Sequence, residues 1–191
     1  MAKISMPVGN QFCPQTLFLY GTYDEEGIPN FGQFCWASYC WDNDLCFMAA
    51  IGEPKMTQDR IRANGVFSAN LVTEDLLPLS DYLGNTSGRS GAKKDLNLPV
   101  EKGRVLDVPI LTQSPVNFEL EVFKTIDLAD ESVIFLCRIR NVLHDESLTD
   151  QGKTLTERLA AIAPVRTTFQ TYYGWDGRPL GDWGQVQKKP Q

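Results

Sequence analysis

A lysine, a methionine and a threonine stand where an apolar segment gives way to a helical one. Lys55, Met56 and Thr57 precede residues 58–64, which we predict to be a short helix with Thr57 as its N-cap and Gly65 after its end. The start of a helix offers free N–H groups and a partial positive charge, to which Lys55 adds a full charge and Thr57 a hydroxyl. These groups together can hold one phosphate, although the same residues also suit a capped surface helix with a solvated lysine.

Residues 84–94 are small and polar, and we interpret them as a functional loop on a scaffold. Gly88 allows a backbone to approach closely, and Arg89, Lys93 and Lys94 supply positive charge. The loop is not a P-loop, because the Gly-Lys-Ser/Thr ending is missing. An ordinary surface loop of this composition is the other interpretation.

An aromatic residue followed by two small ones marks the next candidate. Trp36, Ala37 and Ser38 lie between Phe34 and Tyr39 in a segment that we predict to be a strand. Small residues leave the strand backbone uncrowded, so a planar ligand can lie against it with its polar edge on the N–H groups. Packing of a central strand into the core is the alternative.

The single histidine, His144, excludes several kinds of chemistry. A nucleophile activated by histidine would have to use it, and a zinc site with two histidine ligands cannot form within one chain. We interpret His144 as the solvated end of a strand. The chemistry is expected to belong to a bound cofactor, or to Lys, Asp, Glu, Tyr or Cys side chains, and we name no catalytic residue and no metal ligand.

The net charge and the length of the apolar runs indicate which partners the protein can have. A formal net charge of −6 and a pI of about 4.8 argue against a protein that wraps nucleic acid, but they leave room for one small basic pocket. The first residues lead into no signal-peptide core, and no apolar run approaches the roughly 20 residues of a membrane span. We therefore expect a cytoplasmic protein with neither a nucleic-acid nor a membrane partner.

Five cysteines without a Cys-x-x-Cys motif indicate reduced, buried thiols; they are Cys13, Cys35, Cys40, Cys46 and Cys137. Cys35 and Cys40 are expected on opposite faces of one strand, too far apart for a disulfide. Cys40 and Cys46 flank a predicted Asp-Asn-Asp turn and can face each other across a hairpin. A redox-active cysteine is the alternative. The apolar neighbours argue against it, because such surroundings raise the pKa of a thiol.

The elements that must position these residues are mainly strands. The pattern predicts strands at 16–23, 30–41, 45–51, 66–73, 116–126 and 132–144, and helices at 58–64, 76–83 and 149–163. The first three strands are expected to form a meander and the last two a hairpin, while Leu155, Leu159 and Ile162 form an apolar stripe on the last helix. We therefore predict a mainly β protein with short helices, built as an antiparallel, Greek-key-like split β-barrel.

The chain length fits one domain, residues 1–191. We place its core at about residues 14–164 and treat residues 165–191 as a C-terminal segment. That segment carries two tyrosines and two tryptophans among glycines, too many aromatic residues for a disordered tail. We expect it to pack on a neighbouring subunit.

The order of these motifs resembles the flavin reductase-like family of FMN-binding split barrels, especially its flavoredoxin-type members. The likeness extends over about residues 14–184, and the order and spacing of the motifs are more specific than any one of them. The matching stretches are residues 21–30, 36–38, 55–57 with Ile61, 66–70, 82–89, 114–121, 172–174 and 180–181.

The resemblance implies that FMN binds noncovalently near the interface of a homodimer. By likeness, Lys55 and Thr57 hold the phosphate, residues 36–38 line the isoalloxazine, Asn70 touches the flavin or its ribityl chain, and residues 87–89 cover it. The cofactor-binding residues that this likeness identifies are Trp36, Ala37, Ser38, Tyr39, Lys55, Met56, Thr57, Asn70, Ser87, Gly88, Arg89 and Lys94, with Lys93 as the alternative loop lysine.

For function, the resemblance implies an FMN-binding oxidoreductase that passes electrons from NAD(P)H through bound FMN to a flavin, a protein or another acceptor. FMN carries the hydride and electron chemistry, so the chain has to capture the phosphate, orient the ring and tune the charge of the reduced ring. A noncatalytic flavin-binding electron carrier of the flavoredoxin type is the alternative. A heme-handling split barrel is weakly supported, because His144 is the only imidazole.

Overall fold

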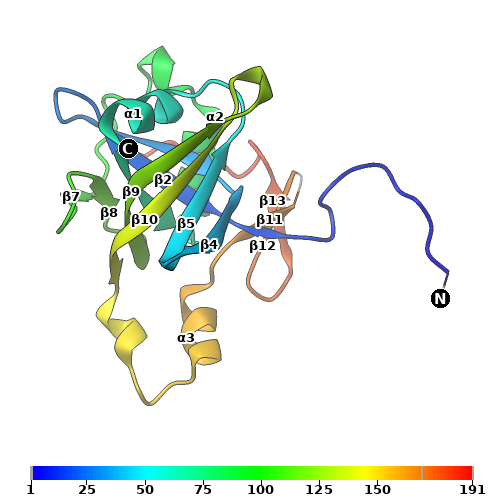
Figure 1. Cartoon of the computed structure of the whole chain (residues 1–191). Coiled ribbons are helices and arrows are strands. Elements are labelled where there is room, and N and C mark those ends of the chain that lie inside the picture. The colour runs from blue at the N-terminus through cyan, green and yellow to red at the C-terminus, as the bar shows by residue number, and fades with distance from the viewer. Residues whose placement is uncertain (1, 169, 191) are drawn as a thin grey trace.

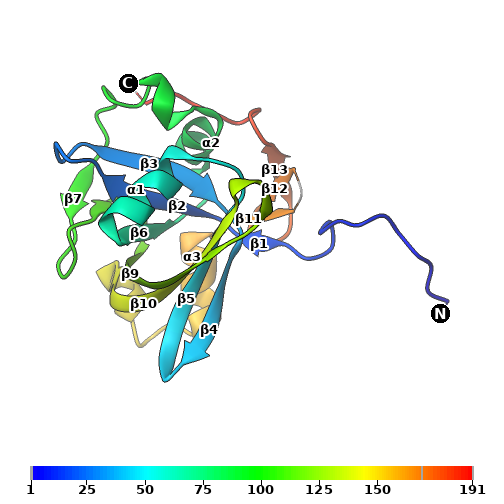
Figure 2. The ribbon, with the colours of Figure 1, turned by 45° about the horizontal axis from the view of Figure 1, so that its top comes forward.

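Seven strands form one antiparallel sheet in the order β3-β2-β6-β9-β10-β5-β4 (Figures 1 and 2). In that order the strands are Pro29–Phe34, Phe18–Tyr23, Val66–Leu71, Val116–Asp127, Val133–His144, Asp44–Ile51 and Ala37–Asp42. The structure is a computed structural model and describes residues 2–168 and 170–190. Every neighbouring pair in the sheet is antiparallel, as predicted.

The two edges of this sheet, β3 and β4, are joined by only two residues, Cys35 and Trp36. The prediction of one strand over residues 30–41 is wrong, because β3 pairs with β2 whereas β4 pairs with β5. The chain leaves one edge of the sheet and enters the other, so its ladder partners change at the break. The first three predicted strands are therefore not a meander, and Cys35 and Cys40 do not share a strand.

The inner face of the sheet holds the main hydrophobic core. Tyr20 of β2 stacks on Phe34 with ring centroids 4.8 Å apart, and its ring meets Phe47 of β5 with centroids 6.3 Å apart. Strands β2 and β5 are not neighbours in the sheet, so the contact shows that the sheet curls into a barrel. Ile61 of helix α1 (Met56–Asn64) packs into the same core.

A second sheet packs beside helix α2 (Leu77–Asn85). Its strand order is β1-β11-β12-β13, and in that order the strands are Gln15–Thr16, Arg166–Thr168, Thr171–Tyr173 and Pro179–Asp182. Tyr172 is fully buried, and its hydroxyl donates a hydrogen bond to Oδ1 of Asp81 at 2.7 Å. The carboxylate of Asp81 also accepts from the N–H groups of Gly184 and Val186. We expected the C-terminal segment to pack on a neighbouring subunit. In the structure it packs on its own chain, because its Tyr172, Gly184 and Val186 donate hydrogen bonds to the buried carboxylate of Asp81.

Helix α3 spans Leu155–Ile162 and is shorter than the predicted helix over residues 149–163. Thr154 and Glu157 form a capping box that sets its first turn, and the separate 3-10 helix Glu146–Thr149 ends before it. Leu155 is 66% exposed whereas Ile162 packs against the main core, so the predicted apolar stripe is only partly buried. In Figure 1, α3 lies below the strands of the large sheet.

The remaining elements are short: β7 (Val100–Lys102), β8 (Pro109–Leu111), and the 3-10 helices η1 (Gly88–Ser90), η2 (Ala129–Glu131) and η3 (Glu146–Thr149). The sequence did not predict the β7–β8 hairpin. Residues 2–14 run away from the barrel as an extended arm (Figure 2). In the part of the chain that the structure describes, no helix has the length and apolar character needed to cross a bilayer.

Candidate functional site

Strand β3, the start of α1 and the 3-10 helix η1 meet beside the barrel. Thr57 is 3% exposed, and its Oγ1 accepts a hydrogen bond from Nδ2 of Asn30 at 3.3 Å. A Cβ on Gly32 would lie 2.8 Å from that oxygen, and one on Gly88 would lie 2.8 Å from Sδ of Met56. Glycine at these two positions therefore lets the three elements approach closely.

Lys55, and not Thr57, occupies the N-cap position of α1, which corrects the sequence prediction. Thr57 turns its hydroxyl into the interior toward Asn30, and none of the described side chains caps the helix. The first N–H groups of α1 therefore keep their hydrogen-bonding capacity and their partial positive charge. Nζ of Lys55 adds a full charge and pairs with Glu53 at 3.0 Å on the surface.

Arg89 brings a second cation to the same place from η1. Ser87 shapes that 3-10 helix, because its Oγ accepts a hydrogen bond from the N–H of Arg89 at 3.3 Å. Nη2 of Arg89 pairs with Oδ2 of Asp59 in α1 at 2.6 Å. Exposed ion pairs of this kind contribute about 0–1 kcal/mol, so an anion can displace the carboxylate. The α1 cluster is defined here as Asn30, Lys55, Thr57, Gly88 and Arg89.

Trp36 lies beside the segment that leads into α1. Its side chain is exposed, and one ring edge lies against Gly52, where a Cβ would meet Cζ3 of Trp36 at 2.8 Å. The carbonyl of Trp36 accepts a hydrogen bond from the N–H of Ala50 at 2.8 Å, which fixes the break between β3 and β4. The exposed indole and Lys55 therefore flank the same loop, residues 52–55.

The other residues of the strand motif divide between the two faces of β4. Ala37 packs against the main core, and the ring of Tyr39 meets the edge of Phe47 with centroids 5.9 Å apart. Ser38 lies on the opposite face and is exposed. The structure thus places Ser38 with Trp36 at the surface and turns Tyr39 toward the end of the core.

Asn70 lies in a different environment. Its Nδ2 donates to the carbonyl of Leu19 and to the hydroxyl of Ser68, each at 2.9 Å. Its Oδ1 accepts from the N–H of Leu111 at 2.9 Å and from Nδ2 of Asn117 at 2.8 Å. These contacts use the full capacity of the amide. The structure therefore does not bring Asn70 to the α1 cluster, and the interior polar network is defined here as Ser68, Asn70 and Asn117.

Glu119 is a buried carboxylate, which the sequence pattern placed only in an alternating strand. Its Oε1 accepts from the N–H of Arg104 at 2.9 Å, and its Oε2 accepts from those of Val105 and Leu106 at 2.8 and 2.6 Å. Nδ2 of Asn141 also donates to Oε1, at 2.8 Å. Burial alone would raise the pKa of Glu119, but these hydrogen bonds together hold it below the ordinary value of 4.5. The carboxylate thus holds the β7–β8 loop on the barrel.

The two loop lysines that the sequence left as alternatives have different environments. Lys93 is buried, and its Nζ donates to the carbonyls of Phe31 at 2.8 Å and Leu83 at 2.5 Å. Burial lowers the pKa of Lys93 to about 8. Lys94 is exposed at the surface. Lys93 therefore anchors the loop of residues 84–94 to β3 and α2, whereas Lys94 lies in solvent.

Asn30 is the member of the α1 cluster to which sequence reasoning gave no role. Its Oδ1 is buried and has no hydrogen-bond partner among the residues that the structure describes. A Cβ on Gly88 would lie 2.9 Å from that oxygen, so the acceptor faces η1. The available signal was an amide at the start of a strand, since a buried amide needs a partner.

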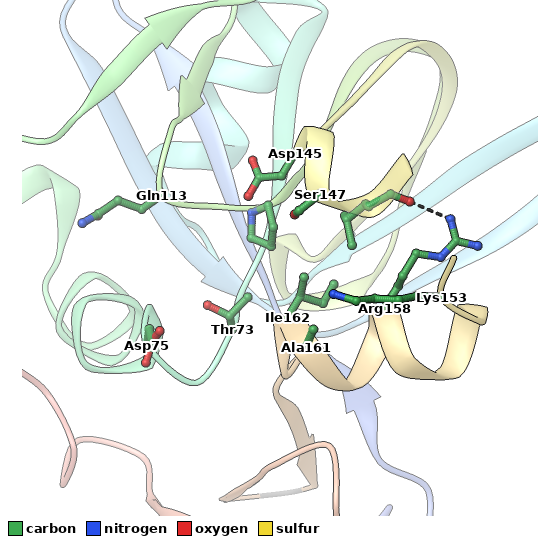
Figure 3. Close-up of a pocket in the computed structure, with 11 residues that line it drawn as sticks. Thr73, Asp75, Gln113, Asp145, Ser147, Lys153, Arg158, Ala161 and Ile162 are labelled. Carbon is green, nitrogen blue, oxygen red and sulfur yellow. Dashed lines mark hydrogen bonds between the residues drawn. The ribbon is translucent and has the colours of Figure 1, made fainter. Parts of the chain in front are cut away.

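A separate pocket of about 300 Å³ opens beside α3 (Figure 3). Charged side chains line it, among them Asp75, Asp145, Lys153 and Arg158. Nη1 of Arg158 donates to the carbonyl of Leu148 at 2.6 Å, the contact drawn in Figure 3. None of the site residues predicted from the sequence lines this pocket, so it is distinct from the α1 cluster.

Residues 10–163 match a family model described as "Flavin reductase like domain". Among solved structures, flavoredoxin of Desulfovibrio vulgaris (Miyazaki F) is 24% identical, with a TM-score of 0.78 over 96% of this chain and 98% of that chain. An FMN-binding protein from Thermus thermophilus, solved with bound p-hydroxybenzaldehyde, is 21% identical, with a TM-score of 0.72 over 95% of each chain. These likenesses confirm the predicted fold class, a mainly β, antiparallel split barrel.

A curated relative comes from Aeropyrum pernix and bears the name "Uncharacterized protein". It is 29% identical over 141 residues, and the match covers 69% of this chain and 53% of the relative. The chain therefore spans about half the length of the curated relative that it matches.

Proposed function

Because the chain belongs to the flavin reductase-like family, we propose that it binds FMN noncovalently and passes electrons from NAD(P)H to a flavin, a protein or another acceptor. Family membership supports a flavin-related oxidoreductase, and we propose FMN as its cofactor and NAD(P)H as its electron donor. The observation that carries the proposal is the α1 cluster, where two cations and a buried hydroxyl lie around the uncapped start of α1. FMN supplies the hydride and electron chemistry when bound.

The phosphate of FMN suits the α1 cluster on chemical grounds. Lys55 and Arg89 supply positive charge, the start of α1 supplies N–H donors, and Thr57 supplies a hydroxyl. Binding exchanges two exposed ion pairs, with Glu53 and Asp59, for charge-assisted hydrogen bonds to one dianion. That exchange is favourable because exposed ion pairs are weak whereas charge-assisted hydrogen bonds at a helix start are strong.

The ring and the ribityl chain need a flat surface and polar partners. Trp36 offers an exposed indole beside the loop that leads to Lys55, and Ser38 adds uncrowded backbone. The unpartnered Oδ1 of Asn30 can accept a hydrogen bond from a hydroxyl or a ring N–H. We assign Asn70 to the support of β6 and β8 and not to flavin contact, because its amide already makes four hydrogen bonds.

An absorption spectrum tests the proposal directly. The purified chain is loaded with FMN, freed of unbound flavin, and mixed with NADH or NADPH without oxygen. Bleaching of the bound flavin supports a reductase. Photoreduction of bound FMN with no response to either nicotinamide supports the noncatalytic electron carrier instead. A chain that retains no FMN contradicts both.

We also propose that two copies form a homodimer. Trp41 is 75% exposed, and Tyr39 and Leu45 are both 51% exposed at the end of the β4–β5 hairpin. Apolar side chains gathered in this way are typical of a surface that a second copy covers. Sedimentation at micromolar concentration tests it: a monomer near 21.4 kDa that still binds FMN contradicts a site built at a dimer interface.

We place the protein in the cytoplasm, with a small-molecule or protein electron acceptor as its partner. All five cysteines are free, which suits a reducing compartment. Fractionation of cells with an antibody to the chain tests this placement, and recovery from an oxidising compartment contradicts it.

A further inference from the structure

Two cysteines face each other directly across the β4–β5 hairpin. Cys40 is the register partner of Cys46, and both thiols are free. Residues opposite each other in an antiparallel pair have Cα atoms about 4.5–5.5 Å apart. A disulfide needs Cα atoms about 4.4–6.8 Å apart, so the Cα spacing typical of such a pair falls within the range of a disulfide.

Both side chains lie on the outer face of the hairpin. The neighbouring pair, Tyr39 and Phe47, points to the opposite face, where Phe47 belongs to the main core. Cys40 is half-buried, whereas Cys46 is fully buried. A small reagent can therefore reach Cys40 first, and Cys46 is placed to react only with its neighbour.

Arg138 fixes a positive charge against the buried thiol. It is the register partner of Cys46 in β10, and its Nη1 donates to Sγ of Cys46 at 3.2 Å. Its Nη2 pairs with Oδ2 of Asp42 at 2.6 Å, and the guanidinium lies 4.2 Å from the centre of the Phe123 ring. The ion pair and the aromatic ring hold the guanidinium in place, so a fixed positive charge lies against the Cys46 sulfur.

We propose that Cys40 and Cys46 form a thiol-oxidation site, which a low-molecular-weight disulfide converts into a cross-strand disulfide. The Cys40 thiolate attacks the reagent, forms a mixed disulfide and releases one thiolate. The Cys46 thiolate, beside Arg138, then attacks the Cys40 sulfur and releases the second. Two thiols lose two protons and two electrons, and the reagent becomes two thiol molecules.

We expect the Cys40 thiol to react slowly with a disulfide at neutral pH. Burial raises the pKa of the Cys40 thiol, and the neighbouring Cys46 and Asp42 raise it further, while Arg138 acts in the opposite direction. Most Cys40 is therefore protonated at neutral pH. Oxidation here needs no flavin and lies outside the proposed electron transfer from NAD(P)H.

The other cysteines provide the controls. Cys137 is buried on the inner face, opposite Phe47, and Cys35 lies in the break between β3 and β4. Cys13 is exposed on the extended arm. A Cys13→Ser background therefore removes the most accessible thiol without touching the hairpin.

Oxidised glutathione is the probe, applied to the full chain in the Cys13→Ser background. Free thiols are then blocked with N-ethylmaleimide, and the chain is cut after aromatic residues. Cleavage after Trp41 leaves Cys40 and Cys46 on separate peptides, which only a disulfide keeps together. We expect this linked pair by mass spectrometry, and Cys46→Ser should instead stop at a glutathione adduct on Cys40.

Two results overturn the proposal. One is full labelling of both Cys40 and Cys46 after prolonged oxidation, and the other is a Cys40 adduct that persists while Cys46 is intact. Arg138→Gln tests the role of the guanidinium, with circular dichroism to verify the fold. We expect the closing step to slow about tenfold, while adduct formation on Cys40 in the Cys46→Ser chain changes little. An unchanged closing rate contradicts the role given to Arg138.

Discussion

The α1 cluster and the buried polar groups around β6 and β9 are both rich in hydrogen-bonding side chains, but they differ in how these are satisfied. Asn70 makes four hydrogen bonds, and Glu119 accepts four. In the α1 cluster, Oδ1 of Asn30 has no partner in the described part of the chain, and the helix start lacks a described side-chain cap. Lys55 and Arg89 form ion pairs only with exposed carboxylates, those of Glu53 and Asp59.

This difference separates polar residues that build the protein from those that can receive a ligand. A buried polar group costs free energy unless it is paired, so a saturated network stabilises the fold and has no capacity left for a ligand. Unsatisfied groups beside close-packed glycines keep that capacity. Changes in the saturated groups should therefore lower stability, and changes in the α1 cluster should lower FMN affinity.

Glu119→Gln should have the largest effect. The amide group replaces one carboxylate oxygen, so at least one buried N–H group loses its acceptor and the others lose a charged partner. We expect the free energy of unfolding to fall by about 3 kcal/mol, measured by urea denaturation. Glu121→Gln, which breaks a surface ion pair with Arg140, should cost about 0.5 kcal/mol or less. Equal losses in the two variants would contradict the assignment.

The same residue predicts a pH dependence. The pKa of Glu119 is lower in the folded chain than its ordinary value of 4.5, so its stabilisation is fully present above that value. The stabilisation is lost as the pH falls through the folded pKa. Between pH 7 and the acid range, the stability difference between the native chain and Glu119→Gln should shrink. A constant difference would argue against a charged carboxylate.

Lys55→Ala tests the other side of the comparison. A charge-assisted contact to phosphate contributes roughly 1.5–3 kcal/mol, so the Kd for FMN should rise about tenfold or more. Stability should change little, because the side chain is exposed and its ion pair with Glu53 is a surface contact. Fluorescence quenching of FMN gives the Kd, with Lys102→Ala, another surface ion-pair lysine, as the matched control. An unchanged Kd would remove Lys55 from the site.

Lys93 lies between the two regions, since it is buried but anchors the loop that carries Arg89. Lys93→Met removes two hydrogen bonds to carbonyls of β3 and α2 and should loosen that loop. We expect the Kd for FMN to rise about fivefold, which corresponds to about 1 kcal/mol. Lys94→Met should leave the Kd unchanged. The reverse result would assign the loop role to Lys94.

The smallest effect is expected from the thiols. Replacing both Cys40 and Cys46 with serine should leave reductase turnover within about a few-fold, because electrons are expected to pass through flavin alone. Turnover is measured by NAD(P)H oxidation with the flavin spectrum as a check on binding. Lost turnover with FMN still bound would reveal a dithiol step in the reaction.

The sequence predicted the strands whose signals are local and missed the features that depend on distant contacts. Strands β9 and β10 were predicted almost to their ends, because their alternation is long and a turn joins them. The break at Cys35 and Trp36 follows from the curl of the whole sheet and leaves no mark in the local pattern. Strands β11, β12 and β13 are only three or four residues long and exist by pairing with one another and with β1.

The site was predicted in the same uneven way. The resemblance identified Lys55, Thr57 and Arg89, and the structure brings them together around α1. It also assigned Asn70, whose saturated amide becomes visible only when its partners from β2, β8 and β9 are in place. Asn30 was missed because the lack of a partner for a buried acceptor is a property of the folded chain.

The strand order has a consequence for the way the chain folds. Six of the seven strands of the sheet form local hairpins, β2–β3, β4–β5 and β9–β10, and hairpins close on a timescale of about 1–10 μs. The ladder between β5 and β10, in contrast, joins Ile51 to Val133 and must wait for a long loop to close. The two-residue link at Cys35 and Trp36 ties the first two hairpins together before that happens. We therefore expect the two hairpins to be tethered early, and the docking of this tethered pair on the β9–β10 hairpin to be slower than the closing of either hairpin.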